Sequence, residues 1–431
     1  MTSHKLLQLE PFIIRLIIFF MANKVYILGG YQTDFAQNWS RNELDLFDVF
    51  KDTVHQGLSS TNLEPKDIDV AHVGNFTAEL FCNQGHLGGF FVSSDPVFYS
   101  GIPASRHEAA CASGSIAALA ASAELELGRY DLAAVIGIEQ MKNVSAHEAA
   151  NNIGGPAMWS GHECQNIDYP WPHMFSLLTE EYEKRYGIDE KYLSRISQVN
   201  LNNAKNNPNS QTRGWTFDDN AFTRLDQHNP VIEGRTRKTD CGQITDGAAI
   251  IFLASEKRAI QYAKDNQIKI EDIPYIKGWG HKTGPITLDE KIAFSKDNKY
   301  IFPHVKDTID DAFRRASMPG VEAIDAIETH DCFSSTEYMA IDHFGITSPG
   351  ESWKAIESGD IELDGKIPIN ASGGLIGLGH PVGATGVRML LDSYKQCTNN
   401  AGDYQIDNAK NVATLNIGGS ATTVVSFVVG V

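Results

Sequence analysis

Two apolar runs constrain the fold of this chain more than any other feature. Leu132–Ile138 and Asn411–Leu415 read as buried β-strands, the kind found in sheets that helices cover on both faces. Each run follows a helix that begins on small residues, at Cys111–Leu127 and at Val387–Tyr394. The repeated plan predicts an α/β protein with two related halves and the chemistry at their junction.

Between the halves the chain changes character. Residues 143–243 are rich in proline and asparagine, and long insertions of this sort in α/β domains are commonly functional. We expect an N-terminal half from residues 21–142 and 244–275, an inserted loop domain at 143–243, and a C-terminal half at 276–431. The clearest helices of the insertion are Phe175–Tyr186 and Lys191–Asn203. At the start of the N-terminal half we expect a strand, Lys24–Leu28, that ends at Gly29-Gly30.

The first twenty residues contain an apolar stretch, Pro11–Phe20, which Arg15 interrupts. No small-residue cleavage site follows it, and it is shorter than the ~20 apolar residues that a membrane helix needs. We therefore predict that residues 1–20 are an extension outside the fold, and that the chain has no stable membrane span.

Composition excludes some classes of partner. The formal net charge of −18 argues against nucleic acid, because phosphate binding needs a basic face. A local basic pocket for a phosphorylated small molecule remains compatible with this charge. The six cysteines are scattered, with no CxxC pair, which disfavours disulfides and zinc fingers and favours a reducing cytoplasm.

Cys111 is the first candidate for chemistry, in the run A-C-A-S-G. It lies at the predicted start of a helix, where free N–H groups and the helix dipole lower a thiol pKa. Its small neighbours leave room for a substrate. The alternative is a buried, inert cysteine packed among alanines, and local sequence alone leaves both readings open.

A glycine-rich run, N-A-S-G-G-L-I-G-L-G-H-P-V-G-A-T-G, surrounds His380. So much glycine costs conformational entropy and suggests unusual φ angles or close approach of a ligand. His380 can act there as a base toward a thiol or bind a developing oxyanion. A phosphate-binding loop is less favoured, because no Lys-Ser/Thr pair follows as in a P-loop.

Two further segments complete the candidate site. In E-T-H-D-C-F, His330 and Cys332 alternate along the backbone, so both can face one cavity. The alternatives are a core histidine beside a buried cysteine, or half of a zinc site; the spacing disfavours zinc, and we predict no metal ion. In N-I-G-G-S, the backbone N–H of Gly418 is a candidate oxyanion donor.

These segments, in this order, resemble the thiolase family from residue 21 to the end of the chain. A-C-A-S-G matches the family's nucleophile motif, and G-G-L-I-G-L-G-H-P-V-G-A-T-G is close to its most specific signature. The resemblance implies a five-layer αβαβα fold with a loop domain over a coenzyme A site. It also implies a homodimer or a dimer of dimers, with coenzyme A as co-substrate and no permanently bound cofactor.

The resemblance also assigns roles and shows two departures. Cys111 would take the acyl group and His380 would activate its thiol, while His173 and Met174 would approach the substrate. Common thiolases have Cys-x-Gly where this chain has Asn416-Ile417-Gly418, and asparagine cannot titrate in this range. The H-D-C-F motif is similar to the sterol-carrier-protein type, in which the motif's cysteine serves as acid and base, so Cys332 would take that role. Asn416 is then expected to contact the substrate.

The implied activity is an acyltransferase: thiolysis of 3-oxoacyl-CoA to acetyl-CoA and a shortened acyl-CoA, or the reverse condensation. The N–H groups of Cys111 and Gly418 would stabilise one oxyanion, and His330 and His380 the enolate oxygen. One alternative is a related condensing synthase, which needs no second catalytic cysteine. Another is a non-catalytic scaffold that binds acyl-CoA.

Overall fold

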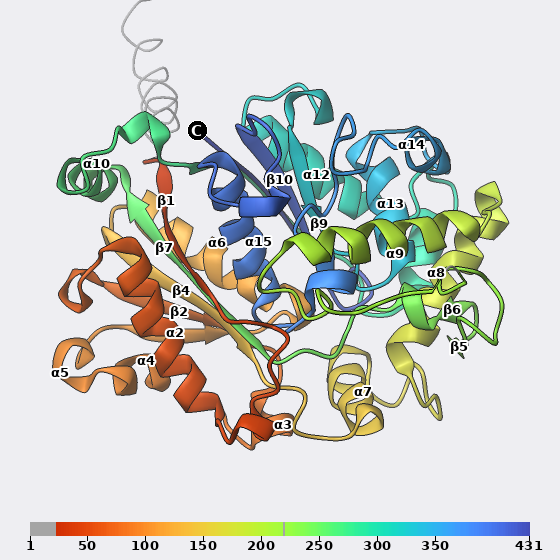
Figure 1. The fold of residues 1–431 in the computed structure, drawn as a ribbon, viewed down its shortest axis with the longest axis horizontal. Coiled ribbons are helices and arrows are strands. Elements are labelled where there is room, and N and C mark those ends of the chain that lie inside the picture. Colours follow the sequence, from red (N-terminus) through yellow and green to blue (C-terminus); the bar gives the residue numbers. More distant parts are fainter. Residues whose placement is uncertain (1–22, 219) are drawn as a thin grey trace, which may run out of the picture.

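The computed structural model describes residues 23–218 and 220–431 (Figure 1). The predicted extension, residues 1–20, lies outside the described residues. Nine strands form one mixed sheet. Its order is β3 (Ala104–His107), β2 (Val70–Gly74), β4 (Leu132–Glu139), β7 (Gly247–Ser255), β1 (Val25–Gln32), β8 (Tyr275–Thr283), β11 (Thr423–Gly430), β10 (Asn411–Gly418) and β9 (Ala326–Thr329).

The two parts of this sheet repeat one pattern. β2 and β4 are parallel, and β7 and β1 follow them antiparallel. In the C-terminal part β9 and β10 are parallel, and β11 and β8 follow them antiparallel. The parts meet at a single residue pair, Tyr26 in β1 and Tyr275 in β8. The predicted pair of similar α/β halves is therefore present in the strand order.

Helices divide the molecule into five layers. The central layer holds α6 (Ser113–Glu126) and α15 (Thr385–Cys397), which pack on each other and on both parts of the sheet. α6 suits this position because small residues surround its axis; Ala117, Ala118 and Ala121 are fully buried, as expected of a helix that is apolar all round. Outside the N-terminal part lie α2, α4 and α10, and outside the C-terminal part lie α12 and α13. The predicted αβαβα arrangement is confirmed.

The helices follow the sequence pattern closely, with shifts at their ends. The predicted Lys191–Asn203 helix is α9 without change, whereas α8 begins at Pro170, earlier than expected. The helix expected from Cys111 begins at Ser113, because Ala110–Ala112 form a separate 3-10 turn. No described helix is both long enough and apolar enough to cross a membrane.

The helices are α2 (Leu46–Thr61), α3 (Ala78–Cys82), α4 (Gly88–Ser94), α5 (Pro96–Tyr99), α6 (Ser113–Glu126), α7 (Ala146–Gly154), α8 (Pro170–Tyr186), α9 (Lys191–Asn203), α10 (Glu256–Asp265), α11 (Leu288–Ser295), α12 (Pro303–Arg315), α13 (Ser334–Phe344), α14 (Trp353–Glu357) and α15 (Thr385–Cys397).

The first strand corrects a prediction. β1 does not end at Gly29-Gly30 but runs on to Gln32, with a bulge between Ile27 and Gly30. A Cβ at Gly30 would lie 1.9 Å from the carbonyl oxygen of Ile250 on β7. Glycine is therefore needed here for close approach of two strands rather than for a turn.

The inserted region has its own elements. It contains α7, α8, α9 and a two-stranded sheet of β5 (Val231–Glu233) and β6 (Thr236–Arg237). α8 and α9 lie beside α13 of the C-terminal part (Figure 1). This packing brings the insertion next to the turn that follows β9, where two candidate site residues lie.

Candidate active site

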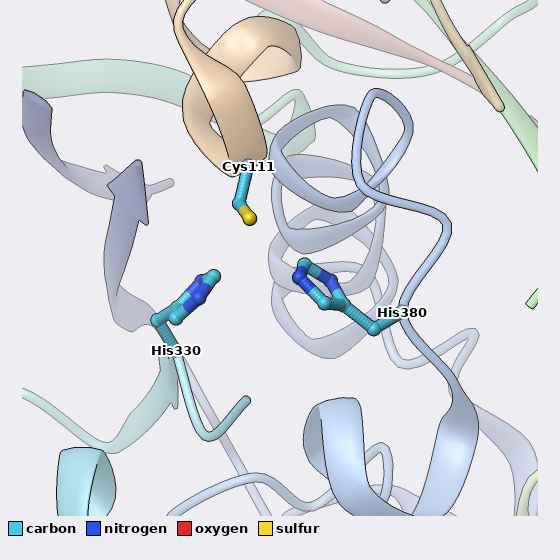
Figure 2. Close-up of side chains that lie close together, drawn as sticks. All are labelled: Cys111, His330 and His380. Carbon is cyan, nitrogen blue, oxygen red and sulfur yellow. The ribbon is translucent and has the colours of Figure 1, made fainter. Parts of the chain in front are cut away.

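Cys111 lies in the tight turn Ala110–Ala112, directly before α6. Ala110 has φ of 49°, a left-handed conformation that is costly for a residue other than glycine. Ser113 holds the turn, because its Oγ accepts from the N–H of Ala109 at 2.9 Å and donates to the carbonyl of Ala110 at 2.6 Å. Figure 2 shows the sulfur of Cys111 pointing between the rings of His330 and His380.

The expected lowering of the thiol pKa is wrong for this structure. Burial raises the pKa of the Cys111 thiol to about 12, and the carboxylates of Glu139 and Glu108 act in the same direction. The backbone N–H of Gly419 and that of Cys111 itself lower this pKa, but by less than burial raises it. The thiol is therefore neutral at neutral pH, and a nearby base would have to take its proton for it to act as a nucleophile.

His380 is placed to be that base. Burial lowers its pKa to about 3, so the ring is neutral. Its Nδ1 lies 2.7 Å from Oγ1 of Thr385, a hydroxyl that also lies 3.1 Å from the carbonyl of Pro381. If the hydroxyl donates to that carbonyl, it accepts from Nδ1–H, and Nε2 keeps a free lone pair. Nε2 is buried and has no hydrogen-bond partner in the described residues, so this assignment leaves it free to accept a proton.

His330 takes the opposite tautomer because of Asn416. The Nδ2 of Asn416 donates to the carbonyl oxygen of Cys111 at 3.1 Å and lies 3.1 Å from Nδ1 of His330. Ser115 donates to the other end of the amide at 2.8 Å. A carbonyl can only accept, so the amide N–H₂ faces both groups, and Nδ1 of His330 must accept as well. The hydrogen of His330 then lies on Nε2. Burial holds the pKa of His330 well below its usual value, so this ring is neutral too.

The two rings and the thiol form one cluster. The rings of His330 and His380 are 5.1 Å apart and nearly perpendicular. The sulfur of Cys111 and one nitrogen from each ring all lie within 4.8 Å of one another, a spacing that a metal ion also accepts. The Asn416 bond argues for acid–base use instead, because an Nε2 that carries hydrogen cannot ligate a metal.

A cavity of about 250 Å³ opens onto this cluster. Cys332 lines it beside Cys111 and the two histidines, as the alternation in H-D-C-F predicted. Burial raises the pKa of the Cys332 thiol well above its usual value, and the neighbouring Cys111 adds to the shift. Cys332 therefore stays protonated and has a proton to give. The rest of the lining is mostly apolar and comes from α7, the start of α8 and the segment around residue 242.

Four predicted residues lie differently from the expectation. The N–H that reaches the sulfur of Cys111 is that of Gly419, one residue beyond Gly418. Neither His173 nor Met174 lines the cavity; Trp171, Pro172 and Phe175 do. Met174 turns instead into the core, since helical spacing places its neighbours on the cavity side. Asn416 is fully buried, contacts His330 and does not line the cavity.

Sequence reasoning missed Asp331, the residue between His330 and Cys332. Its carboxylate accepts from the N–H groups of Leu375 at 2.6 Å and Ile376 at 3.1 Å, and from Nδ2 of Asn200 at 2.8 Å. A Cβ at Gly374 would lie 2.4 Å from this carboxylate, and Gly374 has φ of 60°. Asp331 thus fastens the H-D-C-F turn to the glycine-rich segment that ends at His380. The only signal of this role in the sequence was the position of Asp331 between His330 and Cys332.

Glu337 lies behind this turn, and its raised pKa should make the stability of the protein depend on pH. Burial and the nearby Asp331 raise its pKa from 4.5 to about 8. The folded state then binds a proton more tightly than the unfolded state, so the free energy of unfolding falls as pH rises from about 4.5 to about 8. Glu337→Gln cannot ionise and should show a shallower fall and higher stability than wild type above pH ~8. Urea unfolding across this range measures both, and an unchanged slope would contradict the assignment.

Comparison with known proteins agrees with this geometry. Residues 25–257 match the family model for the thiolase N-terminal domain, and residues 288–431 match the thiolase C-terminal domain-like family. An acetyl-CoA acetyltransferase of Methanothermobacter thermautotrophicus is 29% identical over 93% of this chain and 97% of its own length. Sterol carrier protein 2 of Gallus gallus is 26% identical over 95% of this chain and 72% of its own length.

Solved structures share the fold at low sequence identity. The Ltp2-ChsH2(DUF35) aldolase matches with a TM-score of 0.72 and 18% identity, over 95% of this chain and 98% of that one. At this identity the likeness concerns the fold alone. The family models, by contrast, match both halves of the chain, and the matched ranges include Cys111, His330, Cys332 and His380. The chain therefore belongs to the thiolase family, as the resemblance of its motifs predicted.

Proposed function

We propose that this thiolase cleaves 3-oxoacyl-CoA with coenzyme A, and catalyses the reverse condensation, through an acyl group on Cys111. The observation that carries the proposal is the placement of the Cys111 thiol between the imidazoles of His330 and His380. The hydrogen-bond partners of the two rings, Thr385 and Asn416, suit opposite tautomers. One ring can accept the thiol proton while the other donates a hydrogen bond to a carbonyl oxygen. Both tasks are needed at once in thioester chemistry.

In the first half-reaction the sulfur of Cys111 attacks the 3-oxo carbon, and its proton passes to Nε2 of His380. The oxyanion that forms accepts from the N–H of Gly419, which already bonds the sulfur in the free site. The Cα–Cβ bond then breaks, and its electron pair becomes the enolate of acetyl-CoA. The enolate oxygen accepts from Nε2–H of His330, and the S–H of Cys332 protonates the carbon, which releases acetyl-CoA.

In the second half-reaction coenzyme A takes the acyl group. The thiolate of Cys332 removes the proton of the incoming thiol, and the sulfur of coenzyme A attacks the acyl carbon. Cys111 leaves and recovers its proton from His380, so both cysteines return to the thiol form. The high pKa of buried Cys332 suits it to alternate as acid and base. A condensing synthase needs no such second cysteine, and the position of Cys332 therefore favours a thiolase.

The cavity supports an apolar acyl group. Its wall beyond the cysteines is formed by aliphatic and aromatic side chains, among them Ile153, Tyr169, Trp171 and Phe175. Phe175 stacks on Phe333 of the H-D-C-F motif at 4.7 Å between ring centres. We propose that the acyl chain lies along this wall, which favours chains longer than acetyl and is consistent with a role in fatty acid β-oxidation.

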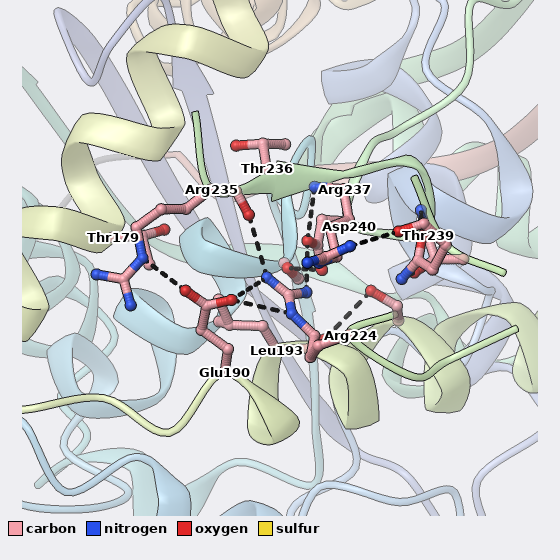
Figure 3. Close-up of polar contacts among 12 residues, drawn as sticks. Thr179, Glu190, Leu193, Arg224, Arg235, Thr236, Arg237, Thr239 and Asp240 are labelled. Carbon is pink, nitrogen blue, oxygen red and sulfur yellow. Dashed lines mark hydrogen bonds and ion pairs between the residues drawn. The ribbon is translucent and has the colours of Figure 1, made fainter. Parts of the chain in front are cut away.

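Coenzyme A carries phosphates, and Lys238 is the cation best placed for them. It is exposed and lines the cavity, within the inserted region. The neighbouring arginines are already paired with carboxylates (Figure 3). Arg224 bonds Glu190 and Asp240, and Arg235 bonds Glu190. We propose that this network holds the insertion in place and that Lys238 contacts coenzyme A.

Assembly and compartment complete the proposal. In the described part of the chain, β3 has a neighbouring strand on one side only, so its outer edge is available for pairing with a second copy. We propose a homodimer on this basis. The six cysteines are all free, which is consistent with a reducing compartment such as the cytoplasm.

Acylation of Cys111 tests the proposed function directly. Incubation with acetyl-CoA should add one acetyl group, which peptide mass spectrometry should place on Cys111. Prior treatment with iodoacetamide should block this addition, and acetyl-CoA should protect against alkylation. A protein that binds acetoacetyl-CoA but gains no acyl group on any cysteine would instead be a non-catalytic scaffold.

A further inference from the structure

The mechanism leaves one buried cation unexplained. Lys291, on α11, is 2% exposed, although lysine is almost never buried so deeply unless it is paired with a carboxylate. Its Nζ donates to the carbonyl of Ile286 at 2.9 Å and to Oγ of Ser420 at 2.8 Å. In the described part of the chain it forms no ion pair; Glu163 and Glu290 act on it only through longer-range attraction.

The contact with Ser420 places this cation beside the nucleophile's hydrogen-bond donor. Ser420 directly follows Gly419, whose N–H bonds the sulfur of Cys111. The turn is strained at Ala421, whose φ of 65° is costly for a residue other than glycine, whereas Gly419 adopts its φ of 64° without cost. His304 supports its other side, since Nε2 lies 2.7 Å from the carbonyl oxygen of Ala421. Lys291 and His304 therefore hold the turn from α11 and α12.

We propose that Lys291 is a positioning residue of the oxyanion turn, where its ammonium fixes Ser420 and adds positive charge behind the N–H of Gly419. That charge favours the thiolate of Cys111 and the tetrahedral oxyanion, both of which develop where Glu139 and Glu108 disfavour negative charge. The proposal rests on the assignment of Cys111 as nucleophile. Lys291 acts through the turn and does not touch the substrate, because it does not line the cavity.

The cost of burying this group is the reason to expect a function. A desolvated ammonium without a paired carboxylate destabilises a fold. Burial lowers the pKa of Lys291 to about 8, so the group keeps its charge at neutral pH in spite of that cost. A neutral side chain could form the same two hydrogen bonds at a lower desolvation cost. Buried, perturbed charges cluster at functional sites for this reason.

The rate at which iodoacetamide alkylates Cys111 tests this inference without a need for substrate. Lys291→Met keeps the length of the side chain and removes its charge. We expect alkylation at neutral pH to slow about tenfold, because loss of the nearby positive charge lowers the fraction of Cys111 present as thiolate. Turnover should fall about tenfold or more through kcat, with KM little changed. The Tm should stay equal to that of wild type or rise, since a buried charge is lost.

Three further variants separate charge from contact and from simple loss of structure. Lys291→Gln keeps a donor toward Ser420 but no charge, and should be nearly as slow as the methionine variant. Ser420→Ala keeps the charge and loses the contact, and should slow alkylation about two- to threefold. Lys277 is the matched control, because its Nζ also donates to two oxygens, on Asn411 and Val431, at the opposite end of β10. Lys277→Met should leave alkylation unchanged.

Two results would overturn the inference. One is alkylation of Lys291→Met and Lys291→Gln at the wild-type rate. The other is a slow rate accompanied by a clearly lowered Tm in both variants, which would show a structural role alone. A failure of the proposed function looks different: wild-type protein would then take up no acyl group from acetyl-CoA, whatever the alkylation rates.

Discussion

Replacing Cys111 by serine should abolish acyl transfer, with kcat at least ~10⁴-fold below wild type. A serine hydroxyl is a weaker nucleophile than a thiol, and His380 has too low a proton affinity to activate it fully. The variant should still fold, because oxygen replaces sulfur at a half-buried position. Steady-state turnover of acetoacetyl-CoA with coenzyme A measures the loss, and intact-protein mass should show no acyl group.

The matched control is Cys164→Ser, a change of the same kind at another half-buried cysteine that does not line the cavity. Its turnover should equal that of wild type within about twofold. Residual activity of Cys111→Ser above a few per cent would rule out the thiol as the acyl carrier.

Replacing Cys332 by alanine should separate two steps that wild type performs together. Transfer of an acetyl group from acetyl-CoA to Cys111 needs no proton at carbon. The thiolate of coenzyme A can also leave without a proton from Cys332, so the variant should still become acetylated. Cleavage of 3-oxoacyl-CoA needs a proton donor for the carbanion, and its rate should fall by about 10³-fold, within the range for loss of a general acid. The condensation should fall equally, because Cys332 then removes the same proton.

Cys241→Ala is the natural control for this change. Cys241 also lines the cavity, but its sulfur donates to the carbonyl of Arg237 at 3.3 Å and has no role in the mechanism. It should keep the ratio of acetylation to cleavage seen in wild type. Normal cleavage by Cys332→Ala would overturn the assignment of the second cysteine and reopen the case for a condensing synthase.

The family motifs named four residues that the structure brings to one cavity. A-C-A-S-G, H-D-C-F and G-L-G-H-P named Cys111, His330, Cys332 and His380, and one cavity joins all four. The motifs did not predict the ionisation of the thiol. Helix position alone suggested a low pKa, but burial, which no local pattern measures, raises it to about 12.

The residues expected to contact the substrate lie away from the cavity. His173 and Met174 came from the resemblance to the family's loop domain, whereas Trp171, Pro172 and Phe175 of the same helix line the cavity. Asn416 was expected to contact the substrate. In the structure it orients His330 and bonds the carbonyl of Cys111, 305 positions away in sequence.

The sequence by itself determined the elements of this protein and named its candidate reactive side chains. An apolar run such as Leu132–Ile138 predicts a buried strand from only a few consecutive residues. The motifs are also short, so they too can be recognised from the sequence alone. The tertiary structure alone decided the tautomer of His330, the role of Asp331 and the burial of Lys291 beside the oxyanion turn. Each of these properties depends on groups that are distant in sequence and lie together in the interior, away from water. The packing of the two halves and the insertion determines which groups meet there.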